Sequence, residues 1–217
     1  MTQRAVMVVA NGFHDEEAAE TVAYLKDHGV DVKVTGIKKG EVTGKHGRQT
    51  LSIDTPVADL NPEDFIALFL PGGTAPEALR LDDDVLSFTR RYFEREGAVV
   101  GAICHGAQIL ISAGVLAGRT LTCYEGIRDD VRLAGARYQD KKVVTDGRLV
   151  TSRTPKDIPA FNEALVKALG LEDTAAENES ADTDADTAVE APADLAAEPD
   201  AAEAAADSDT EPTEATR

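Results

Sequence analysis

The residues Ala102-Ile103-Cys104-His105-Gly106 place a thiol between small residues, directly after an apolar run that is typical of a buried strand. A nucleophile held on a sharp turn between a strand and a helix needs small residues two positions before and after it, because the chain passes close to itself there. Ala102 and Gly106 meet that requirement. The spacing therefore predicts a nucleophile elbow that carries the sulfur of Cys104.

A helix that begins just after Cys104 would favour the thiolate, because a helix N-terminus carries partial positive charge. The alternative is a buried cysteine that only ends a strand, which is a common position for this residue type. Cys123 lies outside any such turn. For Cys123, core packing is the better interpretation.

A thiol nucleophile also needs a base and donors for an oxyanion. His105 follows Cys104, but neighbouring residues on a helix point about 100° apart, so its ring need not reach the sulfur. Gly72 and Gly73 follow another predicted strand. They could bring backbone amides to an oxyanion, or they could form an ordinary turn.

Acidic residues open the first predicted helix at the same edge of the expected sheet. A protonated carboxyl at Glu17 could hydrogen bond Cys104. Acidic residues in a first helical turn commonly interact only with the helix dipole. We expect that limited role for Asp15 and Glu16.

The elements that must position these groups alternate between strand and helix. Apolar runs predict strands at 5–10, 30–34, 66–70 and 98–103, with weaker strand signals at 121–123, 143–144 and 149–151. Helical spacing covers 15–27, 82–96, 107–113, 127–134 and 158–169, and residues 38–48 predict a surface hairpin. This order predicts an α/β fold with a mostly parallel sheet, helices on both faces, and sites at the carboxyl ends of the strands.

The acidity of the chain is concentrated at its C-terminal end. The 217 residues include 40 Asp and Glu against 22 Lys and Arg, and 16 of the acidic residues lie in 171–217 with one basic residue, Arg217. That segment is rich in alanine and has too little apolar surface to offset the entropy of ordering a chain. We expect an α/β domain over 1–170 and a disordered acidic tail over 171–217, which serves solvation or binds a basic partner.

Composition also excludes several classes of protein. No stretch approaches the roughly 20 apolar residues of a membrane-spanning helix, and no cleavable signal pattern opens the chain, so a cytoplasmic location is expected. A formal net charge of −18 would repel nucleic acid and anionic lipid. Two cysteines are too few for a disulfide framework, and we expect neither a metal nor a cofactor.

Five motifs follow one another along the chain. They are NGFHDEE after the first strand, GEVTGKHG (40–47), LPGGTAPE (70–77), AICHGAQILISAGVLAGR (102–119) and YEGIRDD (124–130). Together they resemble the PfpI-like intracellular proteases, whose superfamily also holds the parkinsonism-associated deglycase and the class I glutamine amidotransferases. The resemblance covers Arg4 to Leu169 and implies a flavodoxin-like, three-layer sandwich.

The resemblance implies a catalytic triad shared between subunits. Cys104 matches the family nucleophile and His105 its triad histidine. Glu77 matches the acidic residue that a neighbouring subunit supplies to orient that histidine. The family forms dimers that assemble into hexamers, so a homo-oligomer is expected.

The remaining carried-over positions line the same pocket. Glu17 matches a protonated glutamate beside the thiol, Gly73 an oxyanion-hole amide, and Tyr124 a pocket-lining tyrosine. Two positions depart from the family pattern: His14 stands where a glutamate is usual at the pocket rim, and Glu125 stands where proline is usual. These departures leave the substrate preference open.

Three functions compete at this stage. The first is a stress-response hydrolase in which Cys104 attacks glyoxal or methylglyoxal adducts, or peptides as an intracellular protease; a pocket walled by subunits favours the small adducts. The second is a non-enzymatic redox-sensing chaperone in which Cys104 is oxidised to a sulfinic acid held by Glu17. Glutamine amidotransfer is discounted, because that class needs a His-x-Glu pair far downstream and no histidine follows His105.

Overall fold

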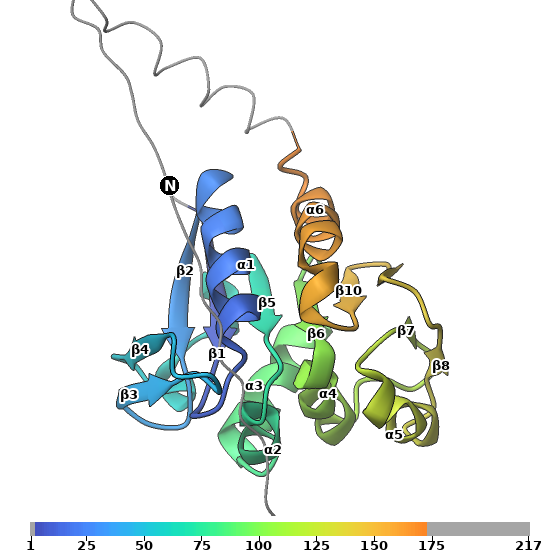
Figure 1. Ribbon diagram of the computed structural model, residues 1–217, viewed down its shortest axis with the longest axis horizontal. Helices are drawn as coiled ribbons and strands as arrows, with labels where there is room; N and C mark the ends of the chain where they lie inside the picture. The colour runs from blue at the N-terminus through green and yellow to red at the C-terminus, as the bar shows by residue number, and fades with distance from the viewer. Residues whose placement is uncertain (1–2, 173–217) are drawn as a thin grey trace, which may run out of the picture. The chain divides into compact units, whose positions relative to one another are not determined.

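The structure, a computed structural model, describes residues 3–172. The predicted disordered tail lies outside the described residues except for its first two positions. A six-stranded sheet forms the centre of the fold, in the order β2-β1-β5-β6-β10-β9 (Figure 1). Its strands are β1 (Gln3–Val8), β2 (Val30–Thr35), β5 (Ala67–Leu70), β6 (Val99–Ile103), β9 (Val143–Asp146) and β10 (Leu149–Ser152). All neighbours are parallel except β9, which pairs antiparallel with β10 at one edge.

Two small sheets flank the central one. The predicted surface hairpin is present as the antiparallel pair β3 (Gly40–Thr43) and β4 (Thr50–Ile53). A short parallel pair joins β7 (Thr120–Leu121) to β8 (Arg137–Tyr138). The sequence analysis did not predict β8, because two residues carry too little periodicity to be recognised.

Helices cover both faces of the sheet. They are α1 (Asp15–Asp27), α2 (Ala75–Leu79), α3 (Asp83–Glu94), α4 (Ala107–Ala113), α5 (Arg128–Leu133) and α6 (Ile158–Leu169). The crossovers from β1 to β2 and from β5 to β6 run in opposite directions along the sheet, so right-handed connections place α1 on one face and α3 on the other. Because α6 packs against α1 and α4 against α3, the predicted three-layer α/β sandwich is confirmed (Figure 1).

The core lies between these layers. The central strands are buried along their length, as their unbroken apolar runs predict for a parallel sheet covered on both faces. On β6, a side chain at Gly101 would press on Phe161 and Leu165 of α6, since a Cβ there would lie 3.0 Å from each. This glycine lets α6 approach the strand that carries the predicted nucleophile.

The parallel strands end at one edge of the sheet. Ser152 of β10 is in register with Ile103 of β6, and Leu70 of β5 is in register with Ala102. The segments that follow β1, β5, β6 and β10 therefore meet there. None of the helices in the described part of the chain is long and apolar enough to cross a membrane.

Candidate active site

Cys104 sits on the tight turn that the spacing predicted. It is the one non-glycine residue in 3–172 with a positive φ, 58°. It opens a short 3-10 turn (Cys104–Gly106) that leads from β6 into α4. A side chain at Gly106 would overlap the carbonyl oxygen of Leu70, which explains why a small residue is needed there. A non-glycine residue in this conformation costs about 1–3 kcal/mol, which the surrounding packing must offset.

Glu17 places a fully buried carboxyl beside the thiol. Its Oε2 accepts a 2.6 Å hydrogen bond from the backbone N–H of Gly72 and the side chain also hydrogen bonds Cys104, while Oε1 has no hydrogen-bond partner. Burial raises the pKa of Glu17 to about 7, against the lowering effect of those two hydrogen bonds. The carboxyl therefore exchanges its proton near neutral pH.

The thiol itself is not activated in the resting site. Burial, followed by the negative charge of Glu17, raises the pKa of Cys104 to about 12, although the backbone amides of His105 and Gly73 act to lower it. The expected stabilisation of the thiolate by the helix is thus outweighed by burial and by the charge of the Glu17 carboxylate. Protonating Glu17 removes that charge, so the two groups titrate as a coupled pair.

His105 reaches the sulfur within one subunit. Its Nδ1 lies 3.3 Å from Sγ of Cys104, so the angular objection raised from the sequence does not apply. The ring of Tyr124 stacks on the imidazole, with centroids 4.5 Å apart and planes at 28°. Burial lowers the pKa of His105, while the negative charge of Glu77 raises it and the positive charge of Lys45 lowers it further.

Glu77 lies on α2, a helix that the sequence analysis did not predict. Its side chain is exposed and forms no hydrogen bond or ion pair within 3–172, although its charge acts on His105. Gly72 and Gly73 lie buried between α2 and the thiol. The amide of Gly72 is engaged by Glu17, which leaves the amide of Gly73 directed at the sulfur.

Asp15 does more than interact with the helix dipole, and our expectation for it was wrong. Its buried carboxylate accepts hydrogen bonds from the backbone N–H groups of His46 (2.8 Å), Arg48 (2.8 Å) and Gln49 (2.9 Å). Burial works to raise the pKa of Asp15, but these amides outweigh it and lower the pKa. A side chain at Gly44 would overlap this carboxylate. Asp15 therefore fixes the β3–β4 loop against the sheet edge.

The β3–β4 loop, which Asp15 holds in place, brings basic groups to the rim of the site. The rings of His14 and His46 meet edge to face with centroids 5.2 Å apart, and Nδ1 of His14 is buried without a hydrogen-bond partner. Burial lowers the pKa of His14. The charge of Lys45 acts on His14, Glu17 and His105 together. The sequence analysis missed Lys45, for which the GKHG motif was the available signal.

Comparison with known proteins identifies the family. The model of the DJ-1/PfpI family matches residues 3–168. The chain belongs to the DJ-1/PfpI family. A deglycase from Pyrococcus horikoshii is 45% identical over 166 residues, which are 76% of this chain and 99% of that protein. The protein/nucleic acid deglycase 2 of Escherichia coli is 41% identical over 172 residues, 78% of this chain and 99% of that protein. A Bacillus subtilis protein named "putative cysteine protease" is 39% identical over 170 residues, 78% of this chain and 99% of that one.

Solved structures of DJ-1/PfpI proteins have the same fold. Drosophila melanogaster DJ-1beta superposes with a TM-score of 0.74 at 27% identity, over 83% of this chain and 97% of that one. A two-domain protein from Anabaena variabilis, with DJ-1/ThiJ/PfpI-like and ferritin-like domains, gives 0.76 at 32% identity, over 79% of this chain and 49% of that one. The resemblance drawn from the five motifs is therefore confirmed. The family and these relatives make a hydrolase-type enzyme the general class of this protein.

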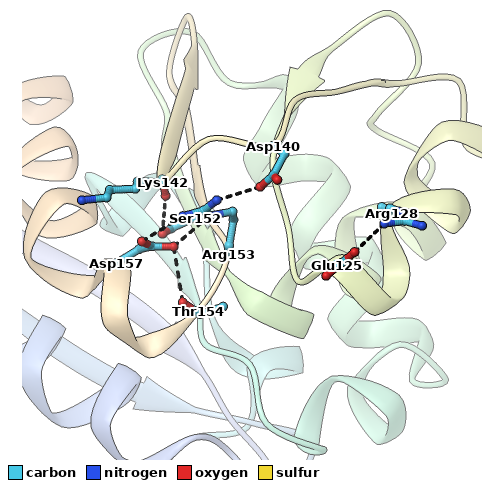
Figure 2. A network of polar contacts seen from close by, with 8 residues as sticks. All are labelled: Glu125, Arg128, Asp140, Lys142, Ser152, Arg153, Thr154 and Asp157. Carbon is cyan, nitrogen blue, oxygen red and sulfur yellow. Dashed lines mark hydrogen bonds and ion pairs between the residues drawn. The ribbon is translucent and has the colours of Figure 1, made fainter.

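A network of polar contacts joins the segment before β9 to the segment after β10 (Figure 2). Arg153 pairs with Asp157 at 3.0 Å and with Asp140 at 2.7 Å, and these contacts raise the pKa of its guanidinium. They tie the segment before β9 to the start of α6. The sequence analysis did not foresee this network, since it joins residues whose spacing follows no periodic pattern.

Glu125 forms its own contact on the same side of the molecule. Its carboxylate pairs with Arg128 at 2.6 Å, three residues on, at the entry to α5 (Figure 2). Glu125 therefore adds an exposed ion pair next to Tyr124. In the described part of the chain, no three His, Cys, Asp or Glu side chains gather so as to hold a metal ion.

Proposed function

We propose that this DJ-1/PfpI protein hydrolyses the adducts that glyoxal and methylglyoxal form with amines and thiols, with Cys104 as the nucleophile. The observation that carries the proposal is the buried thiol at a strained backbone position, in contact with a carboxyl whose pKa is about 7. Such a carboxyl can accept the thiol proton near neutral pH. The deglycases of P. horikoshii and E. coli, similar over nearly their whole length, support the choice of substrate.

In the first step, the thiol proton of Cys104 passes to the Glu17 carboxylate. Sγ then bonds to the hydroxyl-bearing carbon of the adduct, and the bond from that carbon to the amine or thiol breaks as this group takes up the proton held by Glu17. His105, 3.3 Å from Sγ, next removes the hydrogen of the same carbon as a proton, and the electron pair moves onto the neighbouring ketone oxygen. The amide of Gly73 is placed to donate to that oxyanion, because it already lies against the sulfur. Return of that proton to the former ketone carbon oxidises one carbon and reduces the other, which gives a 2-hydroxyacyl thioester of Cys104. Water hydrolyses the thioester to the 2-hydroxy acid, lactate in the case of methylglyoxal, and the free thiol.

His14 and Tyr124 form the walls of the proposed substrate pocket. Tyr124 is 40% exposed and holds the His105 ring by stacking, so it is available to a bound adduct. His14 presents a largely neutral imidazole at the rim where relatives of the PfpI type carry a glutamate. Replacing a carboxylate by a neutral ring removes repulsion toward adducts that carry a negative charge.

The test is turnover of methylglyoxal adducts of N-acetylcysteine and N-acetylarginine by the purified chain. Lactate is measured beside the freed thiol or amine, because spontaneous reversal of the adduct yields methylglyoxal and no lactate. We expect Cys104→Ser to lose at least about 1,000-fold in kcat/KM. Cys123→Ala, which alters the other buried cysteine, is the matched control and keeps the activity.

Other outcomes of this assay choose among the alternatives. Cys104-dependent cleavage of a fluorogenic peptide, without turnover of the adducts, replaces the proposal by the intracellular protease. No Cys104-dependent turnover of either substrate rejects the enzyme. A chaperone activity that survives or increases on peroxide treatment then supports the redox-sensing alternative.

We also propose that the active form is a homo-oligomer built from dimers, in which Glu77 orients His105 of the neighbouring subunit. The support is that the Glu77 carboxylate is exposed and forms no hydrogen bond or ion pair within 3–172, although its charge also acts on His105 of its own chain. An orienting hydrogen bond across an interface would satisfy both residues. Such an arrangement makes assembly a requirement for turnover.

Subunit mixing tests the shared triad. Cys104→Ser and Glu77→Gln subunits are each expected to be nearly inactive as homo-oligomers. In a mixed dimer, the subunit that keeps Cys104 receives Glu77 from its partner, so equal mixing restores about a quarter of wild-type activity. If Glu77 acts within its own chain, mixing restores nothing and the shared triad is wrong.

A further inference from the structure

A second cavity lies at the opposite edge of the sheet from Cys104. It has a volume of about 200 Å³ and lies at the amino ends of β6 and β10, where Val100 and Leu149 contribute to its buried apolar wall. Three arginines line it, Arg95, Arg119 and Arg148, and no acidic residue does. Three guanidinium groups therefore surround one apolar wall.

Two of these guanidinium groups have free donor capacity. Arg119 lies over the ring of Phe93, 5.1 Å from its centroid, and forms no ion pair within 3–172. Arg148 donates one hydrogen bond, from Nη1 to the carbonyl oxygen of Gly97 at 2.6 Å, and likewise has no carboxylate partner in that range. Since a guanidinium carries five N–H donors, most donors of both groups remain available.

Arg95 is already engaged and gives the cavity a fixed positive wall. Its Nη1 donates to the carbonyl oxygens of Pro62 (2.6 Å) and Phe65 (2.9 Å), and Nε lies 3.1 Å from the Glu63 carboxylate. Glu63, Asp64 and Glu96 line a neighbouring hollow, and Arg95 and Arg148 line both that hollow and this cavity. Arg119 does not line that hollow, and neither Arg119 nor Arg148 forms an ion pair within 3–172.

We propose that this cavity is a binding site for a phosphate group, either free phosphate or the phosphate of a small monoester. The planar fork of arginine matches phosphate oxygens with paired hydrogen bonds, and the apolar wall strengthens the attraction by excluding water. The volume is below the roughly 300–1,000 Å³ of pockets that enclose drug-sized ligands, which suits a group of this size. The overall negative charge of the chain repels anions at long range, so binding depends on these local contacts.

Calorimetric titration of the full-length protein with inorganic phosphate tests the site, at constant ionic strength in a buffer free of phosphate and sulfate. We expect saturable binding of one phosphate per chain. Arg119→Gln and Arg148→Gln should each weaken it at least tenfold, the loss expected for charge-assisted hydrogen bonds. Arg91→Gln is the matched control: Arg91 is exposed on α3, does not line the cavity, and carries the same charge. Glycerol 3-phosphate, titrated in parallel, distinguishes a site for free phosphate from a site for a phosphate monoester. If glycerol 3-phosphate binds more tightly than inorganic phosphate, the ligand is a monoester.

Two further measurements distinguish a loss of phosphate contacts from misfolding of the arginine variants. Arg119→Lys keeps the charge and the contact with Phe93 but loses the fork, so it should bind phosphate more weakly than wild type while its circular dichroism is unchanged. Phosphate should shift the amide NMR signals of Gly97 and Leu149 and leave that of Gly73 in place. Absence of saturable binding, equal weakening in Arg91→Gln, or shifts confined to Gly73 would overturn the proposal. None of these outcomes depends on whether the protein is a deglycase.

Discussion

Replacing Glu17 by glutamine should remove a large pH dependence of stability. Glu17 is fully buried, and its pKa rises from 4.5 in an unfolded chain to about 7 in the folded one. Below pH 4.5 the carboxyl is protonated in both states. Between pH 4.5 and 7 the unfolded chain ionises first, so the free energy of unfolding falls by up to about 1.4 kcal/mol per pH unit. Above pH 7 the loss is complete, at about 3 kcal/mol.

Glutamine cannot ionise, and its side-chain oxygen can still accept the hydrogen bond from Gly72. Urea unfolding of both proteins at one concentration, from pH 5 to pH 8, measures the difference directly. We expect the free energy of unfolding of Glu17→Gln relative to wild type to increase by about 2–3 kcal/mol over that range. The difference isolates Glu17, because every other ionisable side chain is present in both proteins.

Glu20→Gln provides the control, since Glu20 is exposed on the same helix and its replacement should leave the wild-type pH dependence unchanged. If the Glu17→Gln and wild-type curves run parallel from pH 5 to pH 8, the carboxyl is not held protonated by burial. The proposed transfer of the thiol proton to Glu17 would then lose its basis.

Three further substitutions test how the site is held. Gly72→Ala should lower kcat/KM at least about 100-fold, because the added Cβ would lie 2.8 Å from the Cβ of Cys104 and 2.9 Å from Oε2 of Glu17. A kcat/KM close to that of the wild type would contradict this close packing. Asp15→Asn should reduce the free energy of unfolding by about 1–3 kcal/mol at pH 7, since it leaves one amide of the β3–β4 loop without its acceptor. For this variant, amide hydrogen exchange in the loop should speed up, and unchanged protection would refute the anchoring role. Tyr124→Ala should lower kcat several-fold, because the His105 ring loses the side chain that stacks on it. Tyr124→Leu keeps an apolar side chain against the ring and should retain more activity. Equal kcat values for the two variants would mean that stacking does not position the imidazole.

Much of the fold could be predicted because it follows from local pattern. The helices at 15–27, 107–113 and 158–169 begin and end where the spacing of apolar residues and the flanking turns placed them. The parallel order of the central strands followed from the alternation of strand and helix. The five-residue α2 and the two-residue β8 were missed, since neither is long enough to show a period.

The residues of the candidate site were likewise predictable where the constraint is local and not where it depends on distant parts of the chain. Cys104 was predicted from two small neighbours, because the steric demand of the turn is local and therefore visible in the sequence. The protonation state of the Cys104 thiol was not predicted correctly, whereas a protonated carboxyl at Glu17 was. The predicted helix effect on the thiol was outweighed by burial and by Glu17, which is 87 positions away along the chain. The anchoring of the β3–β4 loop by Asp15 joins residues about 30 positions apart, and no periodicity marks such a contact.

The sequence by itself determined the order of the elements, the position of the elbow and the family, because backbone propensity, apolar periodicity and motif spacing act between near neighbours. The tertiary structure decided which charges meet and how far water is excluded from them. It set the pKa of Glu17, brought Lys45 to the rim, and gathered Arg95, Arg119 and Arg148 around one cavity. Electrostatic energies depend on distance through space and on desolvation, and the folded chain alone defines both.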